Sequence, residues 1–398
     1  MSPDSFDLDR QVSDAERLRR WRLVLGGGDD GTGASLAGQD VRIDAALGAV
    51  YDATGEDRRG RRPSRAGGLG RSTPTVTRWL GDIRRFFPTD VVQVLQRDAI
   101  DRLKLRQLLL EPEMLAAVEP DIHLAALVVE LSHLLPDESR AAAREVVAQV
   151  VAELERRFAQ RTRAAVHGAL ARSSRTRRPR PGDIDWDRTI RANLRTWTTE
   201  SRTIVPERLV GHGRKERSLA RDVIVAIDQS GSMAESVVHA ALFGAVLATM
   251  PSLRTSVVAF DTSVVDLTDV ATDPVDLLFG VQLGGGTDIG AALSYCQTLV
   301  HRPTDTVLVV VTDLFEGGDP AVALERFARL AADGVTVVVL LALSDDGAPA
   351  HDHAFARELA DVGIACLACT PDAFPDLMAA ALEGQDLVKA GSRLGHRG

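Results

Sequence analysis

The sequence predicts an irregular all-α domain followed by a doubly wound α/β domain with a mostly parallel sheet. From residue 222 onward, short aliphatic runs alternate with helix-forming stretches. Runs such as "TVLVVVTD" are apolar on both faces, which is typical of parallel strands covered by helices on both sides. The charge changes at the same place: residues 222–398 contain 8 Lys+Arg and 24 Asp+Glu, whereas residues 1–221 contain 39 and 32. The change of sign indicates separate modules that either contact each other or share a charged partner.

The first domain, residues 1–155, is predicted to be helical. Ser13 and Glu16 have the spacing of a capping box, and a helix is expected from there to the glycines at 26–28. The Gly-, Asp-, Ser- and Arg-rich stretches 27–39 and 53–73 predict loops. Beyond them, apolar residues three and four apart, interrupted by prolines, predict helices over 75–87, 89–110, 112–118, 121–135 and 137–171.

Residues 156–221 are interpreted as an Arg-rich linker and connector. Nine arginines and no acid lie between Glu155 and Asp183. A solvated helix end with a flexible linker is the first interpretation, and docking on an acidic protein surface or contact with nucleic acid are the alternatives. The four tryptophans are predicted to be core or interdomain anchors; they are Trp21, Trp79, Trp186 and Trp197.

The α/β domain is expected to cover 222–384, with a tail at 385–398. Strands are predicted at 223–227, 255–260, 264–267, 306–312, 335–342 and 364–369. Helices are predicted between them at 234–249, 288–300, 319–333, 352–361 and 373–383.

The ends of the predicted strands carry oxygen ligands. In doubly wound sheets a ligand binds beyond the carboxyl ends of the strands, where the strand order reverses. The first strand ends at Asp228 and "TVLVVVTD" ends at Asp313, so both carboxylates are expected in one crevice. Ser230 and Ser232 follow the first strand, and "LGGGTDIG" places Thr287 at a helix start. Two carboxylates and three hydroxyls suit Mg²⁺, with Mn²⁺ or Ca²⁺ as alternatives, and disfavour zinc and copper.

Structural roles could also explain these residues. Ser232 and Glu235 have capping-box spacing, and Thr287 or Asp288 could cap the following helix. Convergence of three separate segments on one crevice favours the metal site. A zinc site drawn from His351, His353, Cys366 and Cys369 is disfavoured, because the two cysteines lie three residues apart on a predicted strand and point to opposite faces.

"DQSGS", the threonine of "GGGTD" and the aspartate of "VTDLFEGG" together resemble the metal-ion-dependent adhesion site of von Willebrand factor A (VWA) domains. The resemblance covers about 222–384 and implies that Ser230, Ser232 and Thr287 bind the ion directly or nearly so. It implies that Asp228 and Asp313 act directly or through water. The stretch from "DIDWDRTIRANLRTW" to "RTIVPERLVGHGRKERS" resembles the bacterial CoxE-like branch. That branch implies a MoxR-type AAA+ ATPase as partner and, in some gene clusters, a SWIM zinc protein.

These features predict a cytoplasmic, non-enzymatic adaptor whose metal captures an Asp or Glu side chain of a protein partner. The chain lacks a P-loop motif and a nucleophile elbow. Three cysteines, an amino terminus without signal-peptide order and no long aliphatic run favour a reducing compartment away from membranes. The alternatives are a Mg²⁺-dependent phosphoester hydrolase and a nucleic-acid-associated protein that uses the Arg-rich linker.

Overall fold

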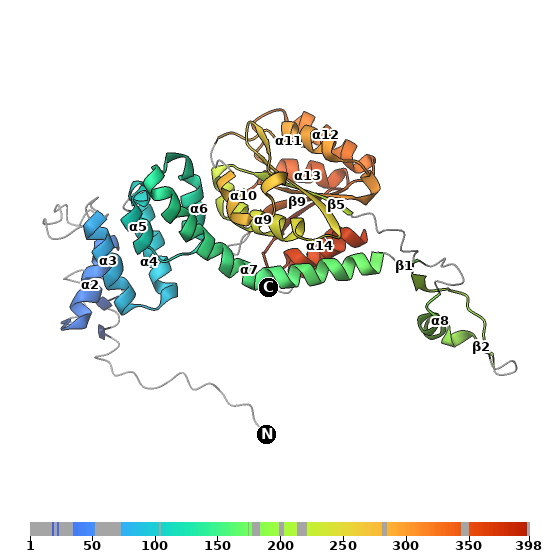
Figure 1. Ribbon diagram of the computed structural model, residues 1–398, viewed down its shortest axis with the longest axis horizontal. Coiled ribbons are helices and arrows are strands. Elements are labelled where there is room, and N and C mark those ends of the chain that lie inside the picture. The colour runs from blue at the N-terminus through green and yellow to red at the C-terminus, as the bar shows by residue number, and fades with distance from the viewer. Residues whose placement is uncertain are drawn as a thin grey trace, which may run out of the picture. The chain divides into compact units, whose positions relative to one another are not determined.

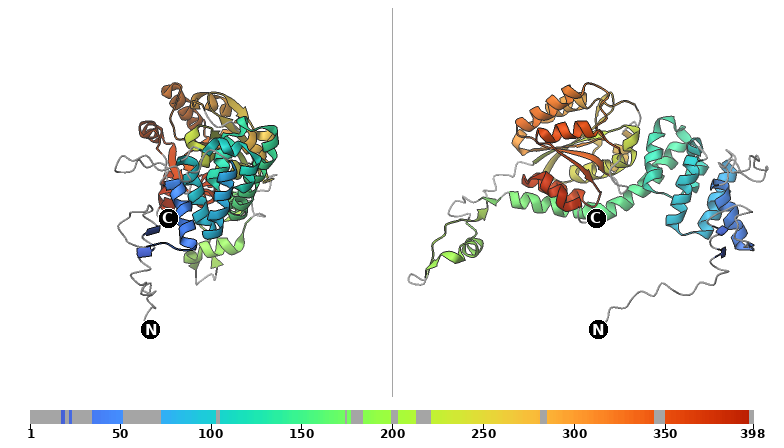
Figure 2. Two further views of the ribbon diagram at one scale, coloured as in Figure 1. Left: turned by 90° about the vertical axis from the view of Figure 1, so that its left-hand side faces the viewer. Right: turned by 180° about the vertical axis from the view of Figure 1, so that it is seen from behind.

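The computed structural model describes residues 18–19, 22–23, 35–51, 73–102, 105–173, 175–176, 184–198, 203–212, 221–280, 285–343 and 350–395. The chain forms two compact units, residues 1–147 and residues 148–398. Figures 1 and 2 show the first unit as helices alone and the second as a sheet covered by helices. Both predicted fold classes are therefore present, although the predicted first helix lies almost wholly outside the described residues.

Short helices separated by prolines make up the first unit. Trp79 is buried there, as predicted, and its indole Nε1 donates to the carbonyl of Ala46 at 2.8 Å. Pro112 is in the first turn of its helix, and Asp121 caps the next by accepting from the amide of Leu124 at 2.6 Å. The helices are α2 (Gln39–Tyr51), α3 (Thr73–Phe86), α4 (Thr89–Arg102), α5 (Pro112–Ala117) and α6 (Ile122–Glu130).

The second unit contains a six-stranded sheet in the order β10-β9-β8-β5-β6-β7. Only β7 at the edge runs antiparallel. The chain starts at β5 in the middle, builds outward to β7, and then returns to β8 on the other side of β5. The strand order therefore reverses between β5 and β8, as predicted. The strands are β5 (Arg221–Asp228), β6 (Leu253–Phe260), β7 (Val264–Asp266), β8 (Thr306–Val311), β9 (Thr336–Leu343) and β10 (Ala365–Cys369).

Helices cover both faces of this sheet (Figure 1). Ile224, Val258 and Leu308 point to one face, where they pack with Ile289 of α11 and Phe327 of α12. Residues of α9 form most of an apolar segment, 231–248, that is long enough to cross a membrane, but this segment is mostly buried in the unit. The helices are α9 (Ala234–Ala248), α10 (Pro274–Gly280), α11 (Ile289–Leu299), α12 (Pro320–Ala332), α13 (His353–Asp361) and α14 (Phe374–Glu383).

The first arginines after residue 155 lie on the long helix that the sequence predicts over 137–171, but from Ala148 onward this helix joins the second unit instead of closing the first domain at residue 155. Helix α7 (Asp137–Ser173) continues without interruption, and from Ala148 onward it belongs to the second unit. Its Phe158 is fully buried, with ring centroids 5.8 Å from Phe243 and 6.1 Å from His239. Phe243 in turn stacks on Phe374 of α14 at 4.2 Å. This half of α7 is therefore part of the hydrophobic core of the α/β domain.

The arginines of α7 pair with acids of α14 and the turn before it. Arg157 contacts Asp372 at 2.6 Å, and Arg161 contacts Asp376 at 3.0 Å. Arg172 contacts Glu383 at 2.5 Å. The acidic surface considered as a docking partner is therefore supplied by the same chain. The opposite charges of the two halves meet along this helix.

Residues 175–176, 184–198 and 203–212 form a small connector module. Trp186 and Trp197 in it are 55% and 51% exposed, so the prediction that they are buried as core or interdomain anchors is wrong for these two residues. Trp21 lies outside the described residues. The module is held by Asn193, whose side chain donates to the carbonyl of Arg208 at 2.7 Å. Its elements are β1 (Arg175–Thr176), α8 (Trp186–Ala192), β2 (Trp197–Thr198), β3 (Thr203–Ile204) and β4 (Gly211–His212).

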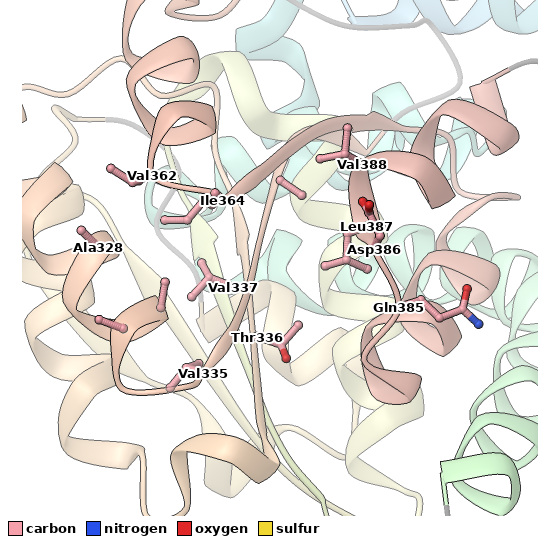
Figure 3. Close-up of a pocket in the computed structure, with 14 residues that line it drawn as sticks. Ala328, Val335, Thr336, Val337, Val362, Ile364, Gln385, Asp386, Leu387 and Val388 are labelled. Atoms are coloured by element: carbon pink, nitrogen blue, oxygen red, sulfur yellow. The ribbon is translucent and has the colours of Figure 1, made fainter.

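The segment interpreted as a tail contains a further helix, α15 (Leu387–Gly395). Leu387 and Val388 line a cavity of about 580 Å³ between this segment and the amino-terminal ends of β9 and β10 (Figure 3). Val337 and Ile364 line it from the sheet side. The cavity lies at the opposite end of the strands from the predicted ligands, and it belongs to the packing of α15.

Candidate metal centre

Parallel pairing of β5 and β8 brings the two predicted carboxylates to the same edge of the sheet. Ile227 pairs with Val311, so Asp228 and Thr312 follow at the same level. Asp228 and Asp313 are both buried. Thr287 is also buried and lies just before α11, which packs on this side of β5 and β6. The three segments named from the sequence therefore meet where the strand order reverses.

A chain of short contacts connects all five predicted ligands. Thr287 Oγ1 lies 3.4 Å from Asp228 Oδ1, and the amide of Ser230 donates to the same oxygen at 2.9 Å. Ser230 Oγ is 3.3 Å from Ser232 Oγ. Ser232 Oγ in turn donates to Asp313 Oδ2 at 2.5 Å. The five residues thus form one cluster of oxygen atoms.

The hydroxyls do not act as helix caps. Neither Ser230 nor Met233, the residues that precede the short turn at 231–233 and helix α9, makes a side-chain cap hydrogen bond. Helix α11 is capped by Asp288, which accepts from the amide of Ala291 at 2.7 Å. Thr287 is thereby left to face Asp228. The capping roles considered from the sequence do not account for the three hydroxyls.

The electrostatics of the cluster favour a cation. Burial raises the pKa of Asp228 above its ordinary value, and the nearby charge of Asp313 adds to the rise, although hydrogen bonds from Thr312 and Ser230 oppose it. Throughout the part of the chain that the structure describes, no lysine, arginine or histidine forms an ion pair with either carboxylate. Two buried carboxylates without a basic partner are costly unless a positive ion joins them. Carboxylate and hydroxyl oxygens are the donor set of Mg²⁺.

Comparison with known proteins identifies the family. The profile described as "VWA domain containing CoxE-like protein" matches residues 158–378. A curated relative, "Uncharacterized protein YehP" of Escherichia coli (strain K12), is 36% identical over 367 residues, which is 92% of this chain and 97% of that protein. The chain belongs to the CoxE-like VWA family. The matched region of this VWA protein begins at Phe158 in α7, as the packing of that helix on the α/β domain would require.

Solved structures similar to this VWA protein come from several bacteria. BatB from Bacteroides thetaiotaomicron is 17% identical and covers 42% of this chain and 98% of its own, with a TM-score of 0.33. An aerotolerance-related membrane protein from Bacteroides fragilis is 18% identical with the same coverages and a TM-score of 0.31. The RO (RSR) protein of Deinococcus radiodurans is 16% identical, covers 94% of this chain and 81% of its own, and has a TM-score of 0.28.

Two residues of the VWA protein's site were missed by sequence reasoning. Thr312 is buried, and its hydroxyl donates to Asp228 Oδ2 at 2.6 Å. Glu316 accepts from the amides of Ile289 at 2.8 Å and Gly318 at 2.7 Å, and burial raises its pKa. Both residues stand within "VTDLFEGG", so a polar residue beside a strand-end aspartate was the available signal. Thr312 orients the Asp228 carboxylate, and Glu316 joins the loop after β8 to the first turn of α11.

The other candidate metal ligands do not form a site among the described residues. No group of three or more His, Cys, Asp or Glu side chains is placed there to hold an ion; the present cluster has only two carboxylates and depends on hydroxyls. Burial raises the pKa of Cys366 and of Cys369 to about 12, so both thiols remain protonated at neutral pH. Cys369 Sγ donates to the carbonyl of Thr370 at 3.3 Å.

Proposed function

We propose that this CoxE-like VWA protein is a non-enzymatic adaptor that captures a protein partner through a divalent cation. Asp228, Ser230, Ser232, Thr287 and Asp313 would hold the ion, with Mg²⁺ preferred over Mn²⁺ and Ca²⁺. When bound, such an ion supplies a positive centre that accepts a carboxylate oxygen from an Asp or Glu of the partner. The observation that supports the proposal is the cluster of two buried, unpaired carboxylates linked to three hydroxyls that cap no helix.

The carboxylates, the hydroxyls and the groups that orient them have different roles in the proposed metal site. Asp228 and Asp313 supply negative charge from neighbouring strands, and the hydroxyls add neutral oxygens that leave part of an ion's charge uncompensated. Thr312 and the amide of Ser230 fix the orientation of the Asp228 carboxylate. The 24 acids against 8 bases after residue 221 attract cations to the domain.

The resemblance to the CoxE-like branch supports the rest of the proposal. The client would be presented to a MoxR-type AAA+ ATPase in the cytoplasm, and a SWIM zinc protein is a further candidate partner. The chain itself contains no P-loop, so the proposed ATP hydrolysis belongs to the partner. Three arginines of the run, Arg157, Arg161 and Arg172, pair with acids of α14 or of the turn before it, so they are engaged within the chain. Arg177, Arg178 and Arg180 lie outside the described residues, and nucleic-acid binding stays an alternative that depends on them.

Metal binding by the full-length chain is the first test. Titration calorimetry with Mg²⁺ and Mn²⁺ should show one site in the wild type and none in Asp228→Ala or Asp313→Ala. Asp333→Ala removes an exposed acid at the opposite edge of the sheet and should bind as the wild type does. Co-purification with a MoxR-type AAA+ ATPase of the same organism should then occur in Mg²⁺ and be lost in EDTA. Metal binding that survives Asp228→Ala would refute the site.

A Mg²⁺-dependent phosphoester hydrolase remains the second candidate because of one observation. The amide of Asp352 donates to the carbonyl of Asp313 at 3.0 Å, so the segment with His351 and His353 borders the cluster. The imidazole rings of His351 and His353 have centroids 4.1 Å apart, and imidazole is the side chain that most often acts as a general base. Turnover of phosphoesters in Mg²⁺ that is lost in His351→Ala would favour the hydrolase, and absence of turnover would favour the adaptor.

A further inference from the structure

The loop that follows β8 has an unusual backbone. Leu314 has φ of 65°, and among the described residues it is the one non-glycine with a positive φ. Its side chain is fully buried in the core of the α/β domain. A left-handed conformation is unfavourable for a residue with a side chain, and such strain occurs mainly where function requires it. The burial of Leu314 holds the loop in this conformation.

Four side-chain or backbone groups fix the rest of the loop. Thr312 Oγ1 accepts from the amide of Leu314 at 3.1 Å, and Asp313 Oδ1 accepts from the amide of Phe315 at 3.2 Å. The Glu316 carboxylate joins the loop to the first turn of α11. The amide of Gly317 donates to the carbonyl of Thr287 at 2.7 Å. The loop is therefore tied to two of the proposed metal ligands, Asp313 and Thr287.

The turn at Leu314 sends the next side chain outward. Phe315 is 51% exposed, although Asp313 and Leu314 on its amino-terminal side are buried. Its amide is bonded to Asp313, so the aromatic side chain starts beside the carboxylate cluster. A large apolar side chain on a fixed backbone loses little freedom when a partner covers it, which is what gives aromatic side chains a large share of binding energy.

We infer that Phe315 is a specificity-determining residue for the proposed capture of a protein partner. The partner would be a segment that carries an Asp or Glu for the metal and a large apolar side chain nearby for Phe315. The inference rests on the proposed function, since the acidic residue must be held at the ion. It adds a preference that the metal alone does not supply: an acidic residue without an apolar neighbour binds more weakly.

The test uses the full-length chain and a synthetic library of nonapeptides. Each peptide has a central glutamate and randomised flanking positions, and binding is measured in Mg²⁺ and in EDTA. The wild type should enrich Leu, Ile, Phe or Met at a fixed distance from the glutamate, in Mg²⁺ only. Phe315→Ala should lose that enrichment and bind the best peptide roughly tenfold more weakly. The direct binding of Mn²⁺, followed by electron paramagnetic resonance, should be unchanged in this variant.

Val362→Ala provides the control. Val362 is also an exposed apolar residue, but it follows α13 before β10, at the opposite edge of the sheet. The Val362→Ala variant should select the same peptides as the wild type. Equal apolar enrichment by the wild type and Phe315→Ala would overturn the inference and leave the metal-dependent capture standing. Failure of the wild type to retain any peptide in Mg²⁺, with Mn²⁺ bound, would overturn both the capture and the inference.

Discussion

Removing the Phe158 ring should destabilise the α/β domain, although this residue lies more than sixty positions before the first strand of its sheet. The ring is fully buried and contacts Phe243 and His239. A Phe→Ala change in a core costs about 3–5 kcal/mol, and each aromatic pair adds about 0.5–1.5 kcal/mol beyond its buried area. Since about 1 kcal/mol shifts the melting temperature of a unit this large by about 2–4 °C, we expect Phe158→Ala to lower it by roughly 10 °C.

Hydrogen exchange measured by mass spectrometry on peptides from β5 and β8 reports the second unit separately from the first. The same substitution at an exposed site, Phe315→Ala, should change stability by less than about 0.5 kcal/mol. Arg161→Ala removes only half-exposed ion pairs and should cost less than about 1 kcal/mol. A shift of less than about 2 °C in Phe158→Ala would refute the assignment of this half of α7 to the core of the α/β domain.

Two further predictions concern the candidate metal centre. In EDTA, Asp228→Asn should be more stable than the wild type at pH 7, because burial raises the pKa of the carboxyl above 3.8 and makes its ionisation unfavourable. Above pH 3.8 the folded wild type therefore binds more protons than the unfolded chain, so the contribution of Asp228 to stability falls as pH rises. The difference in stability between Asp228→Asn and the wild type should therefore become smaller on acidification. Thermal melts from pH 4 to 8 measure this difference, and a difference in melting temperature that does not change with pH would contradict the prediction. Gly317→Ala should weaken Mg²⁺ binding, because the added Cβ would lie 2.9 Å from the backbone oxygen of Thr287 and push the loop after β8 away from the segment before α11. Calorimetry with Mg²⁺ compares this variant with Gly231→Ala, in which the added Cβ meets nothing within 4 Å and binding should be unchanged.

The sequence predicted the α/β elements to within a few residues because their signals are local. Aliphatic runs mark buried parallel strands, and all six predicted strands are present. Prolines and caps marked the ends of the helices in the first unit, such as Pro136 before α7. What the sequence did not predict were short or weakly patterned elements, namely α2, α8, α10 and α15. Such elements depend on tertiary packing more than on their own periodicity.

The end of α7 shows a different limit. Its arginines indicated a solvated helix end leading into a linker, because local composition contains no information about distant partners. The acids that pair with Arg157 and Arg161 are more than two hundred residues away, at Asp372 and Asp376. The prediction for Trp186 was wrong in the other direction. Its large aromatic side chain predicted burial, but it is exposed at the start of α8. Aromatic size alone does not say whether the covering surface belongs to the same chain.

The candidate site could be predicted because its topology was predictable. Once β5 and β8 are neighbours, Asp228 and Asp313 must share an edge, whatever the intervening helices do. The hydrogen bonds among the ligands could not be foreseen, and they carry a consequence for how an ion would bind. Ser232 donates to Asp313, and Thr287 lies within reach of Asp228, so the oxygens already satisfy one another. A cation must therefore exchange with these hydrogen bonds, and it gains most by relieving the desolvated charge of the carboxylates. In the proposed capture, specificity for the partner would then come from side chains around the cluster, and Phe315 is an exposed apolar side chain that the loop after β8 holds beside it.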